Sequence, residues 1–257
     1  MEAGSAVLLT GAGIASGLVG SVAGLASLFS YPALLAVGLP PVSANVTNTV
    51  ALFTNTVGTA AGSRQELRGQ RSRLLRLAGI AAVGGSVGAA LLLGTPSSAF
   101  EYIVPWLIAL GSVLILVREP LRRLSARLSR GEEGRSRALP AQAGAVLLVG
   151  LYGGYFGAAA GVLMLAVLSL SASEPLPVTN AVKNMATGAA NVTAAVAYAF
   201  LAPVAWGPAL ALGLGCLIGS RVGPVVVRHI PETPLRIAIA VAGLGLAISL
   251  WSGISAS

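Results

Sequence analysis

The chain has 257 residues, of which 55% are hydrophobic and only 9% are charged, and its mean hydropathy is +0.85. Soluble domains carry about 25% charged residues, so this composition excludes an ordinary soluble protein and indicates a polytopic membrane protein with almost no extramembrane domain. The net charge of +8 is spread over several loops instead of forming one patch, which argues against a nucleic-acid partner.

Apolar segments follow one another along the chain, at roughly 5–37, 41–61, 74–94, 101–117, 140–171, 177–201, 207–227 and 235–251. The first and fifth are too long for one crossing, at about 33 and 32 residues, and each has glycines in its middle. They are either long tilted helices or broken, re-entrant ones, and their excessive length favours broken helices. The other segments each fit one crossing. The expected fold is an all-α polytopic integral membrane protein.

The second half of the chain repeats the first, at offsets from 133 (17 to 150) to 136 (48 to 184). The matching positions are Gly17, Gly20 and Gly24 with Gly150, Gly153 and Gly157; Pro41-Val42-Ser43 with Pro177-Val178-Thr179; Asn48 and Asn55 with Asn184 and Asn191; and Gly84 and Gly88 with Gly219 and Gly223. A duplicated membrane chain with polar residues at matching depths is typical of a transporter. We therefore predict a first repeat at 1–117, a linker at 118–139 and a second repeat at 140–257.

The distribution of arginine predicts the orientation of these repeats. The stretches 62–76, 118–137 and 221–236 have net charges of +4, +4 and +2, whereas the connections 38–41, 95–100 and 202–206 have no Lys or Arg. The positive-inside rule places all three basic stretches in the cytoplasm. Eight simple crossings cannot do this, but two inverted halves can, if the first and fifth segments each enter and leave on one side. The basic linker is then cytoplasmic, and its leucines at helical spacing indicate a short amphipathic helix on the inner leaflet.

The asparagine pairs are the first candidates for a binding site. Seven residues make nearly two helical turns, so Asn48 and Asn55 should share a face, as should Asn184 and Asn191. Amides are costly in lipid unless they are paired, so we expect both pairs to face one another across a central site. The alternative is that they form interhelical hydrogen bonds that hold the bundle together. Neighbouring polar residues complete this predicted substrate site: Asn45, Thr47, Thr179 and Asn180.

Lys183 is the second candidate, because it is the only lysine in the chain. It lies about two turns into the sixth segment, where a fixed positive charge would attract an anion. The alternative is a side chain that snorkels to the membrane interface. Arg221 is a weaker second cation, because it lies close enough to a cytoplasmic end to serve orientation alone.

Three glycines, Gly24, Gly157 and Gly161, are the third candidates. Glycine permits a break in a helix and a close approach of the backbone to a ligand. Opposed N-termini of two broken helices would direct partial positive charge at an anion. The alternative is close helix packing through small residues, which is how we interpret Gly84 and Gly88.

Acidic and metal-binding residues are scarce. The chain has no aspartate, and its glutamates all lie in loops or at segment ends, so a carboxylate proton relay or a divalent-cation site is not expected. The single cysteine, Cys216, excludes an intramolecular disulfide and a cysteine-based metal cluster. With no nucleotide-binding loop or catalytic triad, we expect neither a cofactor nor a metal, and not an enzyme.

Several motifs together resemble the sulfite exporter TauE/SafE family. Residues 38–48, Gly-Leu-Pro-Pro-Val-Ser-Ala-Asn-Val-Thr-Asn, resemble that family's Gly-Leu-Pro followed by an Ala-x-Gly-Thr-Ser/Asn-like element. Pro32 resembles the proline that ends the family's first glycine-rich run, residues 157–161 resemble its Gly-x-Gly-Gly-Gly element, and 204–206 resemble its Val-Asp-Trp motif. The stretch 180–184 resembles a variant of the family, and the whole resemblance spans about 10–251. This chain departs from the pattern at 23–27, Ala-Gly-Leu-Ala-Ser, and at Val46, where the family has glycine.

The resemblance implies a multi-pass permease of the bacterial plasma membrane that moves sulfite, sulfonates or related small sulfur-containing anions. The residues alone lead only to a carrier for a small anionic solute within a lipid bilayer. Two alternatives stay open: a carrier for a cation or a neutral organic solute that uses Asn and Thr oxygens, and a non-transporting membrane assembly factor. Assembly into a homo-oligomer is compatible with each of them.

Overall fold

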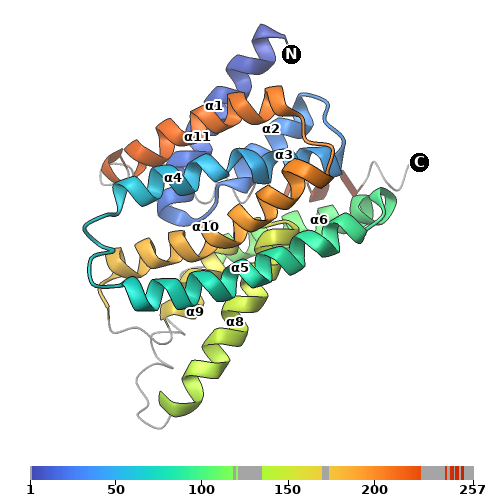
Figure 1. The fold of residues 1–257 in the computed structure, drawn as a ribbon. Coiled ribbons are helices and arrows are strands. Elements are labelled where there is room, and N and C mark those ends of the chain that lie inside the picture. Colours follow the sequence, from blue (N-terminus) through green and yellow to red (C-terminus); the bar gives the residue numbers. More distant parts are fainter. Residues whose placement is uncertain are drawn as a thin grey trace.

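The structure, a computed structural model, describes residues 2–117, 120, 135–169, 174–226, 241, 244–245, 247–248 and 250–251. Within these residues every regular element is a helix (Figure 1). In chain order the helices are α1 (Ala3–Ala23), α2 (Ser27–Ala36), α3 (Pro41–Ala51), α4 (Phe53–Gly62), α5 (Arg71–Gly94), α6 (Ser97–Leu116), α8 (Arg135–Tyr155), α9 (Ala160–Ser169), α10 (Leu176–Leu201) and α11 (Trp206–Val226). In the described part of the chain, α1, α5 and α6 (over Ser97–Leu114) are both long and apolar enough to cross a membrane. The predicted all-α class and multi-pass character are confirmed.

Both long apolar segments are broken, as their length and glycines predict. The first is divided into α1 and α2 at Gly24, whose φ of +75° is left-handed and therefore favours glycine. Its N–H donates to the carbonyl of Gly20 over 2.9 Å and ends the helix. The fifth is divided into α8 and α9 by Gly157, with φ +77°, and Ala159, with φ +58°. The shorter helices α2 and α9 both have ten residues and begin at matching positions, 27 and 160.

The second segment of the first half is also broken, which corrects the expectation of one continuous helix at 41–61. It divides at Leu52 into α3 and α4, whereas α10 is continuous over 26 residues. At this break, side chains replace backbone N–H groups as the hydrogen-bond donors to backbone carbonyls. The hydroxyl of Thr54 donates to the carbonyl of Ala51 over 2.8 Å, and the amide of Asn191 donates to the carbonyl of Thr49 over 2.9 Å. A break without Gly or Pro can persist because these side chains satisfy the freed carbonyls.

Helices of the two halves pack on one another in matched pairs. The most extensive contacts join α1 with α11 and α5 with α8, so the first helix of each half lies on the helix of the third apolar segment of the other half. Glycines allow both contacts. A β-carbon built at Gly219 would overlap the carbonyl oxygen of Ile14, and one built at Gly84 would overlap that of Leu147. The predicted packing role of Gly84 is confirmed.

The helices α3 and α4 run antiparallel to α10. At the beginning of α3, the hydroxyl of Ser43 donates to the carbonyl of Pro203 over 2.8 Å, just after the end of α10. Further along, Thr49 meets Asn191, and Thr56 of α4 lies against Gly188. The beginning of α3 is therefore beside the end of α10.

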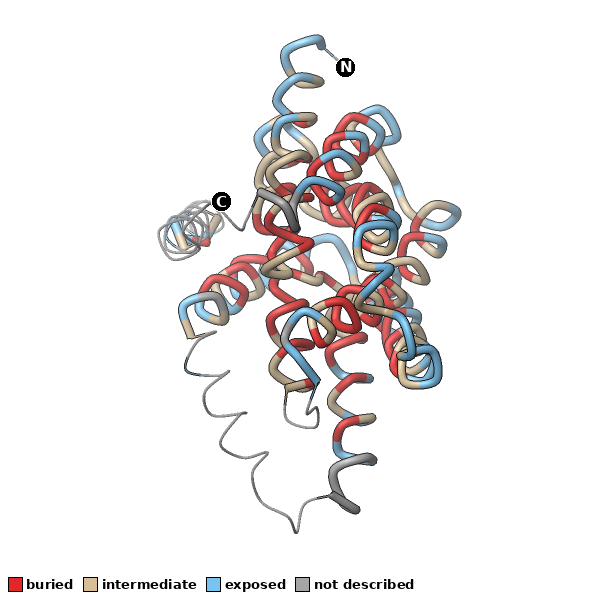
Figure 2. The backbone as a smooth tube through the Cα atoms, turned by 90° about the vertical axis from the view of Figure 1, so that its left-hand side faces the viewer, coloured by how far each residue is buried: buried red, intermediate tan, exposed pale blue. Residues whose placement is uncertain are grey.

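Apolar burial is greatest in the middle of the bundle, where the two halves meet (Figure 2). Aromatic rings from both halves join there: the centroids of Tyr31 and Phe156 are 5.3 Å apart in an edge-to-face pair. This packing fixes the breaks of the two long segments relative to each other. It also positions the cavity described below, because Phe156 lines that cavity.

The predicted linker at 118–139 is only partly described. Helix α8 begins at Arg135, so the second half starts its first helix inside the range predicted as linker. The amphipathic stretch predicted earlier in the linker lies, except for Pro120, outside the described residues, and so does most of the eighth apolar segment.

Candidate functional site

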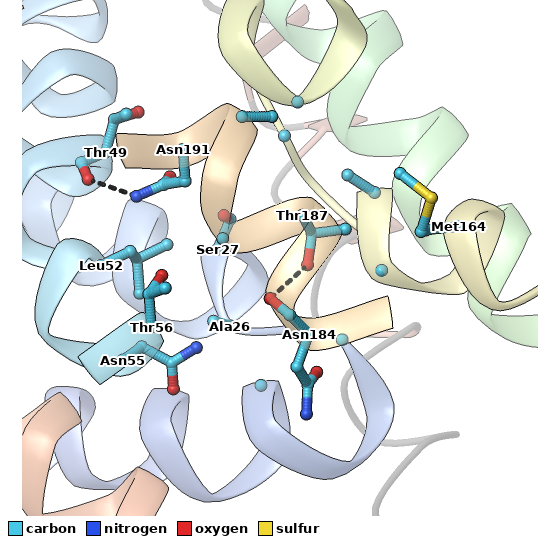
Figure 3. Close-up of a pocket in the computed structure, with 18 of the residues that line it drawn as sticks. Ala26, Ser27, Thr49, Leu52, Asn55, Thr56, Met164, Asn184, Thr187 and Asn191 are labelled. Atoms are coloured by element: carbon cyan, nitrogen blue, oxygen red, sulfur yellow. Dashed lines mark hydrogen bonds between the residues drawn. The ribbon is translucent and has the colours of Figure 1, made fainter. Parts of the chain in front are cut away.

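A cavity of about 80 Å³ lies where the breaks of the two halves come together (Figure 3). Its walls come from α1 and α2, α3 and α4, α8 and α9, and α10. The lining residues are Gly20, Gly24, Ala26, Ser27, Thr49, Leu52, Asn55, Thr56, Val149, Gly150, Gly153, Phe156, Gly157, Ala160, Gly161, Met164, Asn184, Thr187, Gly188, Ala190 and Asn191. None of these is Asp, Glu, His, Lys or Arg, so the wall combines apolar groups with hydroxyls and amides but has no charged side chain.

Matching positions of the two halves line this cavity together. The pairs are Gly20 with Gly153, Gly24 with Gly157, Ser27 with Ala160, Leu52 with Gly188, and Asn55 with Asn191. The cavity is therefore formed at the interface between the halves, by residues that the internal repeat relates to one another.

The breaks themselves are in direct contact. A β-carbon built at Gly24 would lie 2.6 Å from the α-carbon of Gly161, and the converse distance is also 2.6 Å. The first residues of the two short helices, Ser27 of α2 and Ala160 of α9, both line the cavity. The first N–H groups of a helix have no partner within it and carry partial positive charge. Most of these groups donate within the breaks: the N–H groups of Leu28 and Phe29 to the carbonyls of Leu25 and Ala26, and that of Ala160 to the carbonyl of Gly157. The two helix starts therefore contribute partial positive charge at one small cavity.

Three of the predicted asparagines line the cavity: Asn55, Asn184 and Asn191 (Figure 3). The amide nitrogen of Asn184 donates to the carbonyl of Ser21 over 2.8 Å, and that of Asn191 donates to Thr49 as described. These asparagines thus join the helices and also border the cavity. The oxygen of the Asn55 amide is buried and has no hydrogen-bond partner among the described residues.

Other predicted polar residues lie behind the cavity wall. Asn45 donates to the carbonyl of Tyr155 over 2.9 Å, and Asn180 donates to that of Ser21 over 3.3 Å. The hydroxyl of Thr47 accepts a hydrogen bond from the backbone N–H of Ala205 over 2.9 Å. Asn48 and Thr179 are buried but do not line the cavity. Only the second asparagine pair therefore borders the cavity with both members.

The two predicted cations lie in different environments. Lys183 of α10 is completely buried, with 0% of its surface exposed, so it does not run along the outside of the bundle. It is next to Asn184 in sequence but does not itself line the cavity. Arg221 is exposed, one turn before the end of α11, and is not at the cavity.

Sequence reasoning missed the hydroxyl groups of the cavity. Ser27, Thr49, Thr56 and Thr187 all line it. Thr187 could have been predicted to line the site, because it follows Asn184 by three residues and therefore shares a helical face with it. Gly20 and Gly153 line the cavity as well, but were noted only as repeated positions.

Comparison with known proteins connects this arrangement to a family. The family model described as "Sulfite exporter TauE/SafE" matches residues 9–250. A protein of Sinorhizobium sp, named "Probable membrane transporter protein ORF9", is 27% identical over 239 residues, which cover 91% of this chain and 88% of that protein. "Probable membrane transporter protein YfcA" of Escherichia coli (strain K12) is 26% identical over 216 residues, which cover 82% of this chain and 77% of that protein. No solved structure shows a significant match.

Proposed function

The chain belongs to the sulfite exporter TauE/SafE family and is a membrane transporter, and from this premise we propose that it moves a small sulfur-containing anion across the plasma membrane of a bacterium. One observation carries the proposal: the breaks of both halves meet at a single cavity lined by matching residues. Transporters with repeated halves bind substrate at such an interface, at the N-termini of discontinuous helices.

The chemistry of the cavity favours an anion. The starts of α2 and α9 offer partial positive charge, and the hydroxyls of Ser27 and Thr56 can donate hydrogen bonds. No carboxylate lines the wall to repel an anion or to hold a divalent cation. Lys183, buried one residue from Asn184, adds a positive charge behind the wall when it is protonated. An oxyanion such as sulfite matches this set of donors.

A flux measurement tests the proposal. Purified protein in liposomes should carry sulfite across the bilayer, and protein-free liposomes should not. Entry of labelled sulfite identifies the anion as a transported species, and repeating the assay with choline in place of the external cation shows whether an alkali cation is needed as well. Liposomes that move an alkali cation but no oxyanion would instead assign the protein to the cation carriers.

The two halves are proposed to be inverted relative to each other in the membrane. The antiparallel course of α3 and α4 against α10 supports this orientation, because the beginning of one lies beside the end of its counterpart. The arginine-rich loop after α4 would then be cytoplasmic, and the uncharged loop after α10 would be outside.

Labelling of single cysteines tests this orientation. In a Cys216→Ser background, Gln65→Cys and Pro203→Cys place thiols at exposed positions in corresponding loops of the two halves. Inverted halves require an impermeant thiol reagent to reach the two positions from opposite sides of the membrane. Labelling of both from the same side would show that the halves are parallel.

A further inference from the structure

At almost every glycine that lines the cavity, neighbouring atoms leave no room for a β-carbon. A β-carbon at Gly20, Gly24, Gly150, Gly157 or Gly161 would lie 2.6 to 2.9 Å from another atom, and one at Gly188 would overlap the side chain of Thr56. Real β-carbons do not approach other atoms so closely, so none of these positions accepts alanine without a shift of the backbone or of a packed side chain.

Gly153 is the exception. The atoms nearest to a β-carbon built there are the β-carbons of Ala160 and Ala190, both at 3.9 Å, which is ordinary van der Waals contact. Gly153 lies inside α8, and its φ is not among the positive values. Glycine within a helix is less stable than alanine by roughly 0.5–1 kcal/mol. Neither backbone conformation nor packing explains glycine at this position.

The missing side chain leaves space in the cavity. Gly153 is part of the wall, and so is Ala160, at the start of α9. We propose that Gly153 is a specificity-determining residue: the absence of a β-carbon there sets the upper size of the anion. This inference rests on the proposed function, because it assigns the size limit of the same anion site.

One methyl group takes up a real share of the cavity. A water molecule needs at least about 10–15 Å³ of space for its centre, so about 80 Å³ gives room for roughly five to eight waters, or for a small anion with part of its hydration. A methyl group is roughly as large as a water molecule. Methanesulfonate has a methyl group where sulfite has a lone pair on sulfur, and it carries one negative charge fewer. The charge difference is the same for the parent and the variant, so a methyl group added to the wall at Gly153 should weaken the binding of methanesulfonate more than that of sulfite.

The test compares the binding of sulfite and methanesulfonate to the purified full-length protein and to Gly153→Ala, by ligand-induced shifts of the unfolding temperature over a concentration series. The ratio of the two affinities should change at least 10-fold in favour of sulfite. Gly144→Ala is the matched control, because it makes the same change in the same helix at an exposed position with nothing within 4 Å. That variant should keep the parent ratio.

A reverse variant makes the test independent of how well Gly153→Ala folds. Ala160→Gly removes a methyl group 3.9 Å from the same point, so it should shift the affinity ratio towards methanesulfonate. If Gly153→Ala weakens the binding of both anions equally, or if neither cavity variant changes the ratio of the two affinities, Gly153 does not determine the size limit. The proposed anion transport would be unaffected by that result. A parent protein that binds neither sulfite, methanesulfonate nor another small oxyanion would contradict the proposed function itself, and this inference with it.

Discussion

Replacement of Gly161 by alanine should abolish anion transport and lower the stability of the fold. The new β-carbon would lie 2.6 Å from the α-carbon of Gly24 and 3.0 Å from its carbonyl oxygen, where neither atom belongs to a flexible side chain. The two breaks must then separate. Overpacking of this kind costs about 1–3 kcal/mol. Because Gly161 lies in the first turn of α9, the separation also moves that helix start away from the cavity.

The effect on transport should exceed the effect on stability. Misplacement of a binding group by about 1 Å can reduce a rate roughly 100-fold, so flux should be lost even where the protein still unfolds cooperatively. Thermal unfolding and liposome flux measured on the same preparation separate the two effects. Gly79→Ala in α5 is the control, because a β-carbon there meets nothing within 4 Å. Parent-like flux in Gly161→Ala would show that the contact between the breaks is not part of the transport site.

The breaks of the long segments could be predicted because their causes are local. A segment of about 33 residues exceeds one crossing, and a glycine in its middle permits the left-handed conformation found at Gly24. The break at Leu52 has no local cause of this kind. Its freed carbonyls are satisfied by Thr54 and by Asn191, which is 142 residues from its partner Thr49. Sequence periodicity within one segment cannot reveal a partner in the other half of the chain.

The same break explains why the site was predicted only in part. The expectation that Asn48 and Asn55 share a face assumes a continuous helix between them. The break at Leu52 falls inside this interval, and only Asn55 lines the cavity. In the unbroken α10 the assumption holds, and Asn184 and Asn191 both line the cavity. Asn48 is buried and does not line the cavity, although its counterpart in the repeat, Asn184, does.

The cavity glycines show a second limit of sequence reasoning. Gly20 and Gly153 occupy matching positions in the repeat, yet a β-carbon would lie 2.7 Å from the side chain of Ala26 in the first case and 3.9 Å from the nearest atom in the second. The sequence contains the same letter at both positions. The three-dimensional arrangement of α2 and α9 is needed to show that Gly20 is a glycine because of close packing, whereas Gly153 leaves space in the cavity.

Loss of the charge of Lys183 should weaken anion binding at least about 10-fold. The side chain is completely buried, and placement of a charge in the membrane costs about 2.5–3.5 kcal/mol on insertion scales. The residue does not line the cavity, so it would act on the anion through the wall formed by its neighbour Asn184. For an ammonium group within about 10 Å of the anion, the attraction is at least about 1.7 kcal/mol at an effective dielectric constant of about 20. A difference of about 1.4 kcal/mol is a tenfold change in affinity.

Two variants of similar length separate charge from packing. Lys183→Met keeps an unbranched apolar chain and removes the ammonium group, so it should keep the fold and lose the affinity. Lys183→Arg keeps the charge on a larger, planar group and should bind sulfite more weakly than the parent but more tightly than Lys183→Met. Sulfite affinities of the purified variants, measured by ligand-induced shifts of the unfolding temperature, give the order directly. If Lys183→Met binds as tightly as the parent, the ammonium group makes no contribution to the anion site and the starts of α2 and α9 must supply its positive potential alone.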